Sequence, residues 1–262
     1  DRAMTSTPPT SDVVVTRDYD LDDPTLLLRR DVFGSVSTPV GAAAEEADAA
    51  SSAPTAHACG PPLLPHSATN PEHRTLVDAL VHTASHSNHG ITFVSNSATD
   101  FERYSELLHA SRRLLAGLRV RGLRAGDVAA LQLVDPRTHL RAVWACALGG
   151  FPSVTVAVAP RLVASNAVAA KLLAALAQLD GRHVLCSDEL EAPLRALLPN
   201  GVAVHTASAV AAAASAADAD PRLLDAAACA PGDTMLYQLT SGSTGVPKAI
   251  AETYGAIVAH IR

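Results

Sequence analysis

Short apolar stretches alternate with amphipathic stretches along most of the chain, and this pattern predicts its secondary structure. Apolar residues spaced three and four apart open a helix at 75–81, for which Thr75 suits the N-cap. The apolar run at 91–94 predicts a strand, and a long amphipathic helix follows it. Thr99 and Glu102 have the spacing of a capping box, which would start that helix near 99.

The same alternation continues from Gly122, which is expected to end the long helix. The segment 128–134 is nearly all apolar and therefore predicts a strand buried on both faces. Further strands are expected at 153–158, 183–186 and 202–205, and further helices at 138–148, 166–179 and 188–198. Strands that alternate with helices of this length predict an α/β fold with a parallel sheet built from βαβ units.

Glycine and proline mark several expected boundaries. Gly90, the Gly149-Gly150 pair and Gly181 are expected to stop helices, and Pro193 to shorten or kink the helix at 188–198. The Ala-rich segment 209–220 is either a weak helix or a surface loop, because its low complexity supports both interpretations.

The most informative stretch is 240–248, Thr-Ser-Gly-Ser-Thr-Gly-Val-Pro-Lys. Glycines at 242 and 245 let backbone N–H groups approach a ligand, and hydroxyls at 240, 241, 243 and 244 donate well to phosphate oxygens. Lys248 adds a compact positive charge, and the apolar run 235–239 just before predicts a buried strand. A strand, a hydroxyl-rich loop and a lysine together predict a site for the phosphates of a nucleotide.

Two other interpretations of this loop are weaker. A Walker P-loop has Gly directly before its Lys and Ser or Thr directly after it, whereas Pro247 and Ala249 stand here. Proline also removes an N–H donor that the Walker loop needs, so an unrelated NTPase is disfavoured. A plain Ser/Gly surface turn would not require this order of residues with a terminal Pro-Lys.

The loop resembles the phosphate-binding motif of the adenylate-forming superfamily, which includes acyl-CoA synthetases, acyl-AMP ligases and nonribosomal peptide synthetase adenylation domains. Weaker matches precede it, namely Tyr104-Ser105-Glu106-Leu107, Gly122-x-x-x-Gly126-Asp127-Val128 and Leu148-Gly149-Gly150. The resemblance covers about 73–262, the first part of the family's large N-terminal domain, and would start the long helix near Tyr104 instead. Gln238-Leu239-Thr240 and the segment 256–261 most resemble ligases that load polyketide or peptide assembly lines.

The resemblance implies a loop between two strands that holds ATP while a carboxylic acid attacks its α-phosphate, giving acyl-AMP and pyrophosphate. Coenzyme A or the phosphopantetheine of a carrier-protein domain would then accept the acyl group. The residues assigned to the phosphates are Thr240, Ser241, Gly242, Ser243, Thr244, Gly245 and Lys248, with Lys248 as the catalytic cation. Mg²⁺ is expected with the triphosphate, and no residue of this chain is assigned as its ligand.

The chain also departs from the family. Ala249 follows the lysine where the family has Gly, and Tyr254 stands where it has His, which puts an acyl-pocket contact in doubt. The family's Tyr-Gly-x-Thr-Glu segment, ribose-binding Asp and C-terminal catalytic Lys would all lie beyond Arg262. The sequence is therefore expected to be a fragment that is inactive alone. The alternative is a catalytically degenerate ligase-like domain that binds nucleotide or a partner.

Charge and composition divide the chain near residue 72. Residues 1–72 hold 11 acidic and 4 basic residues, whereas residues 73–262 hold 15 and 16. The Ala-, Ser- and Pro-rich segment 1–72 is expected to be disordered or linker, and 73–262 to be the folded domain. The near-neutral domain has no basic stripe, which disfavours nucleic-acid binding. The acidic cluster 18–23 lacks the Gly and Glu of a calcium loop and is expected to be solvated linker.

The remaining candidate chemistry is weak. The four cysteines, at 59, 146, 186 and 229, form no C-x-x-C pair, which fits a reducing cytoplasmic compartment. His82, His86 and His89 have helical spacing for zinc, but His89 is expected to lie past the helix end, so no metal site is predicted. The longest apolar run, 143–159, is broken by Gly149-Gly150 and Pro152, so no membrane span is expected.

Overall fold

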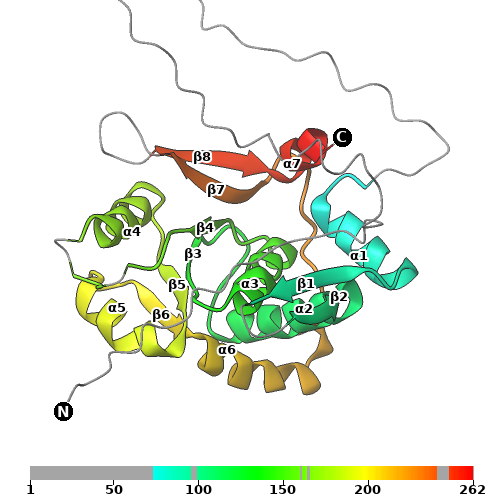
Figure 1. Ribbon diagram of the computed structural model, residues 1–262, viewed down its shortest axis with the longest axis horizontal. Coiled ribbons are helices and arrows are strands. Elements are labelled where there is room, and N and C mark those ends of the chain that lie inside the picture. The colour runs from blue at the N-terminus through cyan, green and yellow to red at the C-terminus, as the bar shows by residue number, and fades with distance from the viewer. Residues whose placement is uncertain (1–72, 96–98, 160, 164–165, 241–247, 262) are drawn as a thin grey trace, which may run out of the picture. The chain divides into compact units, whose positions relative to one another are not determined.

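The computed structural model describes residues 73–95, 99–159, 161–163, 166–240 and 248–261 (Figure 1). The expected linker 1–72 and its acidic cluster lie outside the described residues. The helices are α1 (Leu76–His86), α2 (Tyr104–Val120), α3 (Pro136–Gly149), α4 (Ala167–Gln178), α5 (Glu191–Leu197), α6 (Ala207–Ala213) and α7 (Tyr254–Ile261). Short 3₁₀ turns are η2 (Asp188–Leu190), η3 (Ala214–Asp218) and η4 (Pro221–Leu224).

The predicted parallel sheet is confirmed. Its strands are β3 (Ala129–Gln132), β4 (Ser153–Thr155), β5 (His183–Cys186), β6 (Ala203–Thr206), β7 (Thr234–Thr240) and β8 (Lys248–Thr253). They lie in the order β6-β5-β3-β4-β7-β8, and β8 alone among these six runs antiparallel to its neighbour. The carboxyl ends of the parallel strands therefore share one edge of the sheet, where open α/β sheets bind their ligands.

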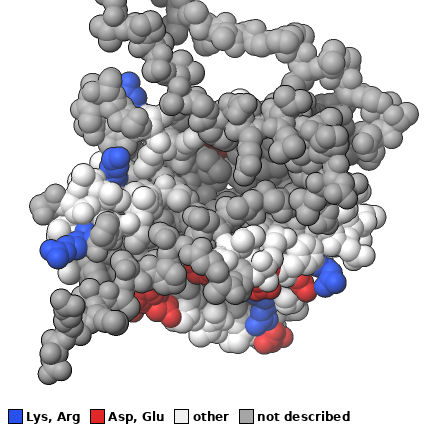
Figure 2. All heavy atoms as spheres, in the orientation of Figure 1, with Lys and Arg blue, Asp and Glu red and all other residues white. Residues whose placement is uncertain are grey.

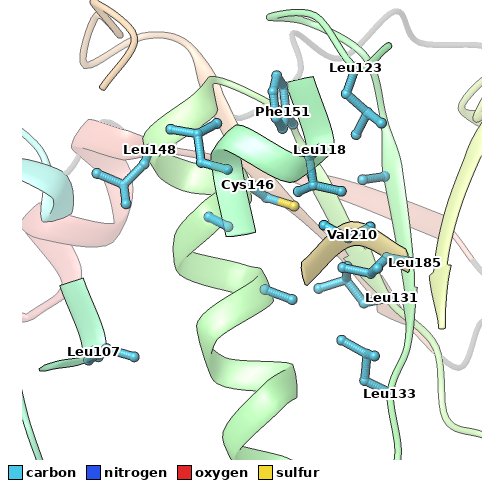
Figure 3. Packing of buried hydrophobic residues seen from close by; sticks show 14 of the residues in the cluster. Leu107, Leu118, Leu123, Leu131, Leu133, Cys146, Leu148, Phe151, Leu185 and Val210 are labelled. Carbon is cyan, nitrogen blue, oxygen red and sulfur yellow. The ribbon is translucent and has the colours of Figure 1, made fainter. Parts of the chain in front are cut away.

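The interior strands bury both faces, as the continuous apolar run predicted. In β3, Ala129 and Leu131 join a core with α1, α2, α3 and α6, while Ala130 joins a second core with α4 and α5. Leu185 of β5 belongs to the first core, where it lies near Leu131 and Val210 (Figure 3). Alternate side chains of one strand therefore stabilise two helical layers.

A two-stranded hairpin precedes α2 and corrects the expected capping box at Thr99. The segment Thr99–Arg103 is strand β2, paired with β1 (Gly90–Val94), and α2 begins at Tyr104. The Glu102 carboxylate is buried and binds Arg141, whose Nη2 lies 2.8 Å from Oε1. The expectation was wrong because a long-range ion pair holds Glu102 in a strand. Local spacing alone does not reveal such a pair.

The glycines that were expected to end helices have different roles in the structure. Gly150 ends α3 in the left-handed region with φ of +68°, as expected of a C-terminal glycine. Gly90 instead lies in β1, where an added Cβ would stand 2.1 Å from the Glu102 carbonyl oxygen, so close approach requires it. After α4 the left-handed residue is Asp180, and the Gly181 N–H donates to the Leu176 carbonyl at 2.8 Å.

The remaining local predictions concern the start of α1, the length of α5 and the Ala-rich segment. Thr75 caps α1 in a reciprocal box with Asp78. Pro193 lies in the first turn of α5, which is short and preceded by η2, as predicted. The Ala-rich segment is helical, as α6 and η3, because it packs on α2, where an added Cβ on Gly117 would stand 2.0 Å from the Val210 carbonyl.

Candidate functional site

The phosphate-binding loop predicted at 240–248 connects β7 to β8. β7 emerges at the carboxyl edge of the sheet, and β8 returns antiparallel to it, with Thr240 directly opposite Lys248. The Thr240 hydroxyl donates to the Lys248 carbonyl at 3.4 Å. The two ends of the loop, including its first hydroxyl and its lysine, are therefore held together. Ser241, Gly242, Ser243, Thr244 and Gly245 lie outside the described residues.

The strand register places the lysine on the same side of the sheet as α3. Residues directly opposite each other in antiparallel strands project to the same face, so Lys248 shares the face of Thr240. Two-residue alternation along β7 puts Gln238 on that face too. Ser153 of β4, which lies opposite Leu236, continues the row. This face carries α3, because Thr155 of β4 bonds to the α3 side chain of His139.

A cavity of about 330 Å³ lies beside this row of side chains. It is lined by Val143, Ser153, Thr155, Leu236, Tyr237, Gln238 and Leu239. The His139 Nε2 atom lies 3.2 Å from the Thr155 hydroxyl at the cavity wall, and burial lowers the pKa of His139. The imidazole is therefore neutral at pH 7, and the cavity presents uncharged hydrogen-bonding groups next to an aliphatic wall.

Lys248 is the single cation in the two described strands of the hairpin, and it is exposed. On the face that Figure 2 shows, the clearly visible acidic side chains lie along the lower part of the molecule with basic ones among them, and the basic side chains on the left stand apart. An anionic ligand at this hairpin would therefore be attracted by a local charge and by hydrogen-bond donors.

Tyr254 anchors the base of the hairpin, and the sequence interpretation missed this role. Its side chain is fully buried, and its hydroxyl donates to the Ala147 carbonyl in α3 at 2.6 Å. Burial raises its pKa, which keeps the phenol protonated. Its backbone N–H donates to the Asp233 carbonyl at 3.1 Å, so both ends of the hairpin base are tied down. The tyrosine at the family's His position thus contacts the core.

The histidines considered for zinc adopt a different arrangement. The rings of His82 and His86 stack with their centroids 4.3 Å apart, and Nδ1 of His86 lies 2.8 Å from the His82 carbonyl oxygen. Helix α1 ends at His86, so His89 lies past the helix, as predicted. Within the described ranges no group of three or more His, Cys, Asp or Glu side chains has a geometry that would hold a metal ion.

A mostly parallel α/β sheet whose strands β7 and β8 flank a hydroxyl- and glycine-rich sequence with a terminal lysine is the arrangement expected of the adenylate-forming class. Comparison with family models specifies the family: residues 82–262 match the AMP-binding enzyme model. The chain therefore belongs to the AMP-binding enzyme family, and the resemblance found in its sequence is confirmed.

Curated relatives include fungal atromentin synthetases. The chain is 27% identical to atromentin synthetase of Tapinella panuoides over 189 residues, which cover 70% of this chain and 19% of the relative. It is 29% identical over 195 residues to atromentin synthetase greA of Suillus grevillei, covering 72% and 20%. The chain thus spans about a fifth of the length of these relatives.

Solved adenylation domains share its fold. One is the adenylation domain of a keto acid-selecting NRPS module bound to keto acyl adenylate, with 29% identity and a TM-score of 0.61 over 73% of this chain and 34% of that one. Another is McyG A-PCP complexed with phenylalanyl-adenylate, with 29% identity and a TM-score of 0.64 over 72% and 30%. A fatty acyl-adenylate ligase from L. pneumophila, 17% identical, has a TM-score of 0.60 over 72% and 32%, and shows the fold alone.

No described helix has the combined length and apolar character that crossing a bilayer requires.

Proposed function

We propose that the loop at 240–248 holds the triphosphate of ATP while a carboxylic acid is activated to an acyl-adenylate with release of pyrophosphate. The observation that carries this proposal is the register that sets Thr240 opposite Lys248 at the carboxyl end of β7. It brings the loop's first hydroxyl and its cation together on one face. Membership of the AMP-binding enzyme family and likeness to adenylate-bound domains support the same reaction.

The proposed roles follow from where charge develops. Negative charge grows on the departing pyrophosphate, and donors aimed at it lower the barrier. Lys248 supplies the positive charge, and the hydroxyls of Ser241, Ser243 and Thr244 donate to phosphate oxygens. The Thr240 hydroxyl has one proton, so it would turn from the Lys248 carbonyl to donate to a phosphate oxygen when ATP binds. Gly242 and Gly245 permit close approach of backbone N–H groups. Mg²⁺ would accompany the triphosphate and neutralise its charge, while the hydroxyl oxygens of this loop are of the hard type that Mg²⁺ accepts.

The acyl-adenylate would pass to a thiol, either of coenzyme A or of a carrier-protein phosphopantetheine. The A-PCP arrangement of the similar McyG structure supports the carrier-protein acceptor. Because the chain spans about a third of these solved chains, the reaction is proposed for the whole adenylation domain. We place the start of that domain near residue 73, with 1–72 as linker, and we expect residues 1–262 alone to be inactive. Cys146, Cys186 and Cys229 are free thiols, which suits a reducing cytoplasmic compartment.

The two lysines of this chain provide a matched test in the complete adenylation domain. Lys248→Ala should lower ATP–pyrophosphate exchange roughly 10-fold to 1000-fold, because loss of a charge-assisted contact costs about 1.5–4 kcal/mol. Lys171, exposed on α4, is the control, and Lys171→Ala should leave exchange unchanged. Equal exchange in Lys248→Ala and in the unsubstituted enzyme would refute the role of the loop.

The alternative is a degenerate domain that retains the fold and has lost the reaction. The replacement of the family's His by the buried Tyr254 favours this alternative, because that position then offers no contact to substrate. The same experiment separates the two functions. A domain that binds ATP but shows no acid-dependent exchange with any carboxylic acid supports the degenerate domain.

A further inference from the structure

Two stacked histidines connect the edge strand β6 to β5, at the margin of the sheet away from β7 and β8. The rings of His183 and His205 lie with their centroids 5.4 Å apart and their planes 16° apart. The His183 Nδ1 and His205 Nε2 atoms are separated by 3.1 Å. His205 is 4% exposed, so its ring depends on protein partners.

The neighbours of this pair fix the direction of its hydrogen bonds. The Arg121 Nε–H donates to His205 Nδ1 at 3.5 Å, and a guanidinium can only donate. His205 Nδ1 is therefore an acceptor, and its proton lies on Nε2, from which it is donated to His183 Nδ1. The His183 proton then lies on Nε2, which is 3.8 Å from Asp127 Oδ2. The result is a one-way relay of hydrogen bonds from Arg121 through His205 to His183, whose Nε2–H faces Asp127 at a distance too long for a hydrogen bond.

Each part of this relay opposes a second proton on His205. A proton on Nδ1 would face the Arg121 guanidinium, and Arg195, which donates to the Val204 carbonyl at 3.3 Å, adds another positive charge from α5. The carboxylates nearby are Asp127, beyond His183, Glu191, which is paired with Arg195, and Asp188, which accepts from the Ser208 N–H at 3.1 Å. A protonated His205 would therefore lose its hydrogen bond and gain two like-charged neighbours.

We propose that the His183–His205 pair is an acid-sensitive switch that holds edge strand β6 on β5 while both rings are neutral and weakens that edge as the pH falls. The switch is independent of the ATP chemistry proposed above, since β6 and β5 are separated from β7 and β8 in the sheet by β3 and β4. Its response is a loss of stability, first in β6.

The sign of the response follows from proton linkage. An unfolded histidine binds its proton at a pKa of about 6.5. Burial, followed by the charges of His183, Arg121 and Arg195, lowers the pKa of His205 to about 4 in the folded chain, and burial also lowers that of His183. Between these values the unfolded state binds more protons, so acid favours unfolding. The unfolding equilibrium constant should rise about 10-fold per pH unit for each ring kept neutral.

The decisive measurement is ¹⁵N NMR of the histidine-labelled chain. Both rings should show the Nε2–H tautomer at pH 7, and the His205 ring should stay neutral down to below pH 5. Arg121 is exposed, so Arg121→Gln should fold, and it should raise the titration midpoint of His205 because one opposing charge is removed. An Nδ1–H tautomer on His205, or titration near 6.5, would overturn the proposal even if no histidine variant folds.

The pH dependence of unfolding provides a second test of the proposal. In urea unfolding from pH 6.5 to 4.5, His205→Gln should reduce the rise of the unfolding constant by roughly 40-fold, because the unfolded ring is already half protonated at pH 6.5. His109, exposed on α2, is the matched control, and His109→Gln should keep the slope of the unsubstituted chain. Hydrogen exchange corrected for intrinsic rates should lose protection in β6 before β3. An unchanged slope in His205→Gln, or β3 opening first, contradicts the switch.

Discussion

The two margins of the six-stranded sheet differ in burial and in chemistry. β6 carries His205 and Val204 into the protein interior and is followed by α6, whereas β8 leaves Lys248 and Ile250 exposed. Both are edge strands of one sheet. At the β6 margin polar side chains are buried and bonded to each other, and at the β8 margin they face solvent beside a cavity. An edge that is covered contributes stability, while an edge that stays open can receive a ligand.

The largest difference is expected when one aliphatic side chain is removed at each margin of the sheet. Leu185 of β5, next to the β6 margin, is 2% exposed, and Ile250 of β8 is 47% exposed. Leu185→Ala should lower the free energy of unfolding by about 2–5 kcal/mol, because it leaves a cavity in the core. Ile250→Ala should cost about 0.5 kcal/mol or less. Urea unfolding of both variants measures the difference.

Comparable losses in the two variants would show that the β8 margin is covered as fully as the β6 margin. An unchanged urea m-value in each variant serves as the control, because it shows that the denatured state has not changed.

The second test concerns the anchor of the β8 margin. Tyr254→Phe keeps the buried ring and removes the hydroxyl that donates to Ala147, so it should cost about 1 kcal/mol of stability. In the complete enzyme the variant should keep the KM for the carboxylic acid, because the hydroxyl points into α3. A KM raised 10-fold or more with unchanged stability would instead place Tyr254 at the acyl group.

Local signals in the sequence were enough to predict most of the fold. The apolar runs predicted β5 at its observed bounds, His183–Cys186, and the N-cap of α1 at Thr75. The alternation of strand and helix predicted the parallel sheet, because right-handed βαβ crossovers leave few other arrangements. The hairpin around the loop entered through family resemblance, and the structure shows its two strands.

The same local signals could not predict contacts between residues far apart in the sequence. Glu102 has a local capping pattern, yet its partners Arg137 and Arg141 lie on α3. His183 and His205 are 22 residues apart and meet because β5 and β6 are parallel neighbours, in which His183 lies opposite Ala203 on the same face as His205. The buried role of Tyr254 depends on a carbonyl 107 residues away. The partners in these pairs meet only once the chain has folded, so the periodicity of a single sequence could not reveal them.

The smallest expected effect lies at the surface of the covered margin. Glu191 accepts two hydrogen bonds from Arg195 one turn later in α5, at 3.0 and 2.9 Å, and both side chains are about half exposed, at 43% and 54%. Solvent screens such a pair, so Glu191→Gln should cost about 0.3–0.5 kcal/mol at most, and less in 1 M salt. Thermal unfolding at low and high salt measures this. A loss above about 1.5 kcal/mol would mean that Arg195 depends on Glu191 to hold the Val204 carbonyl. The stability of the β6 margin would then depend on a surface ion pair as well as on the buried histidines.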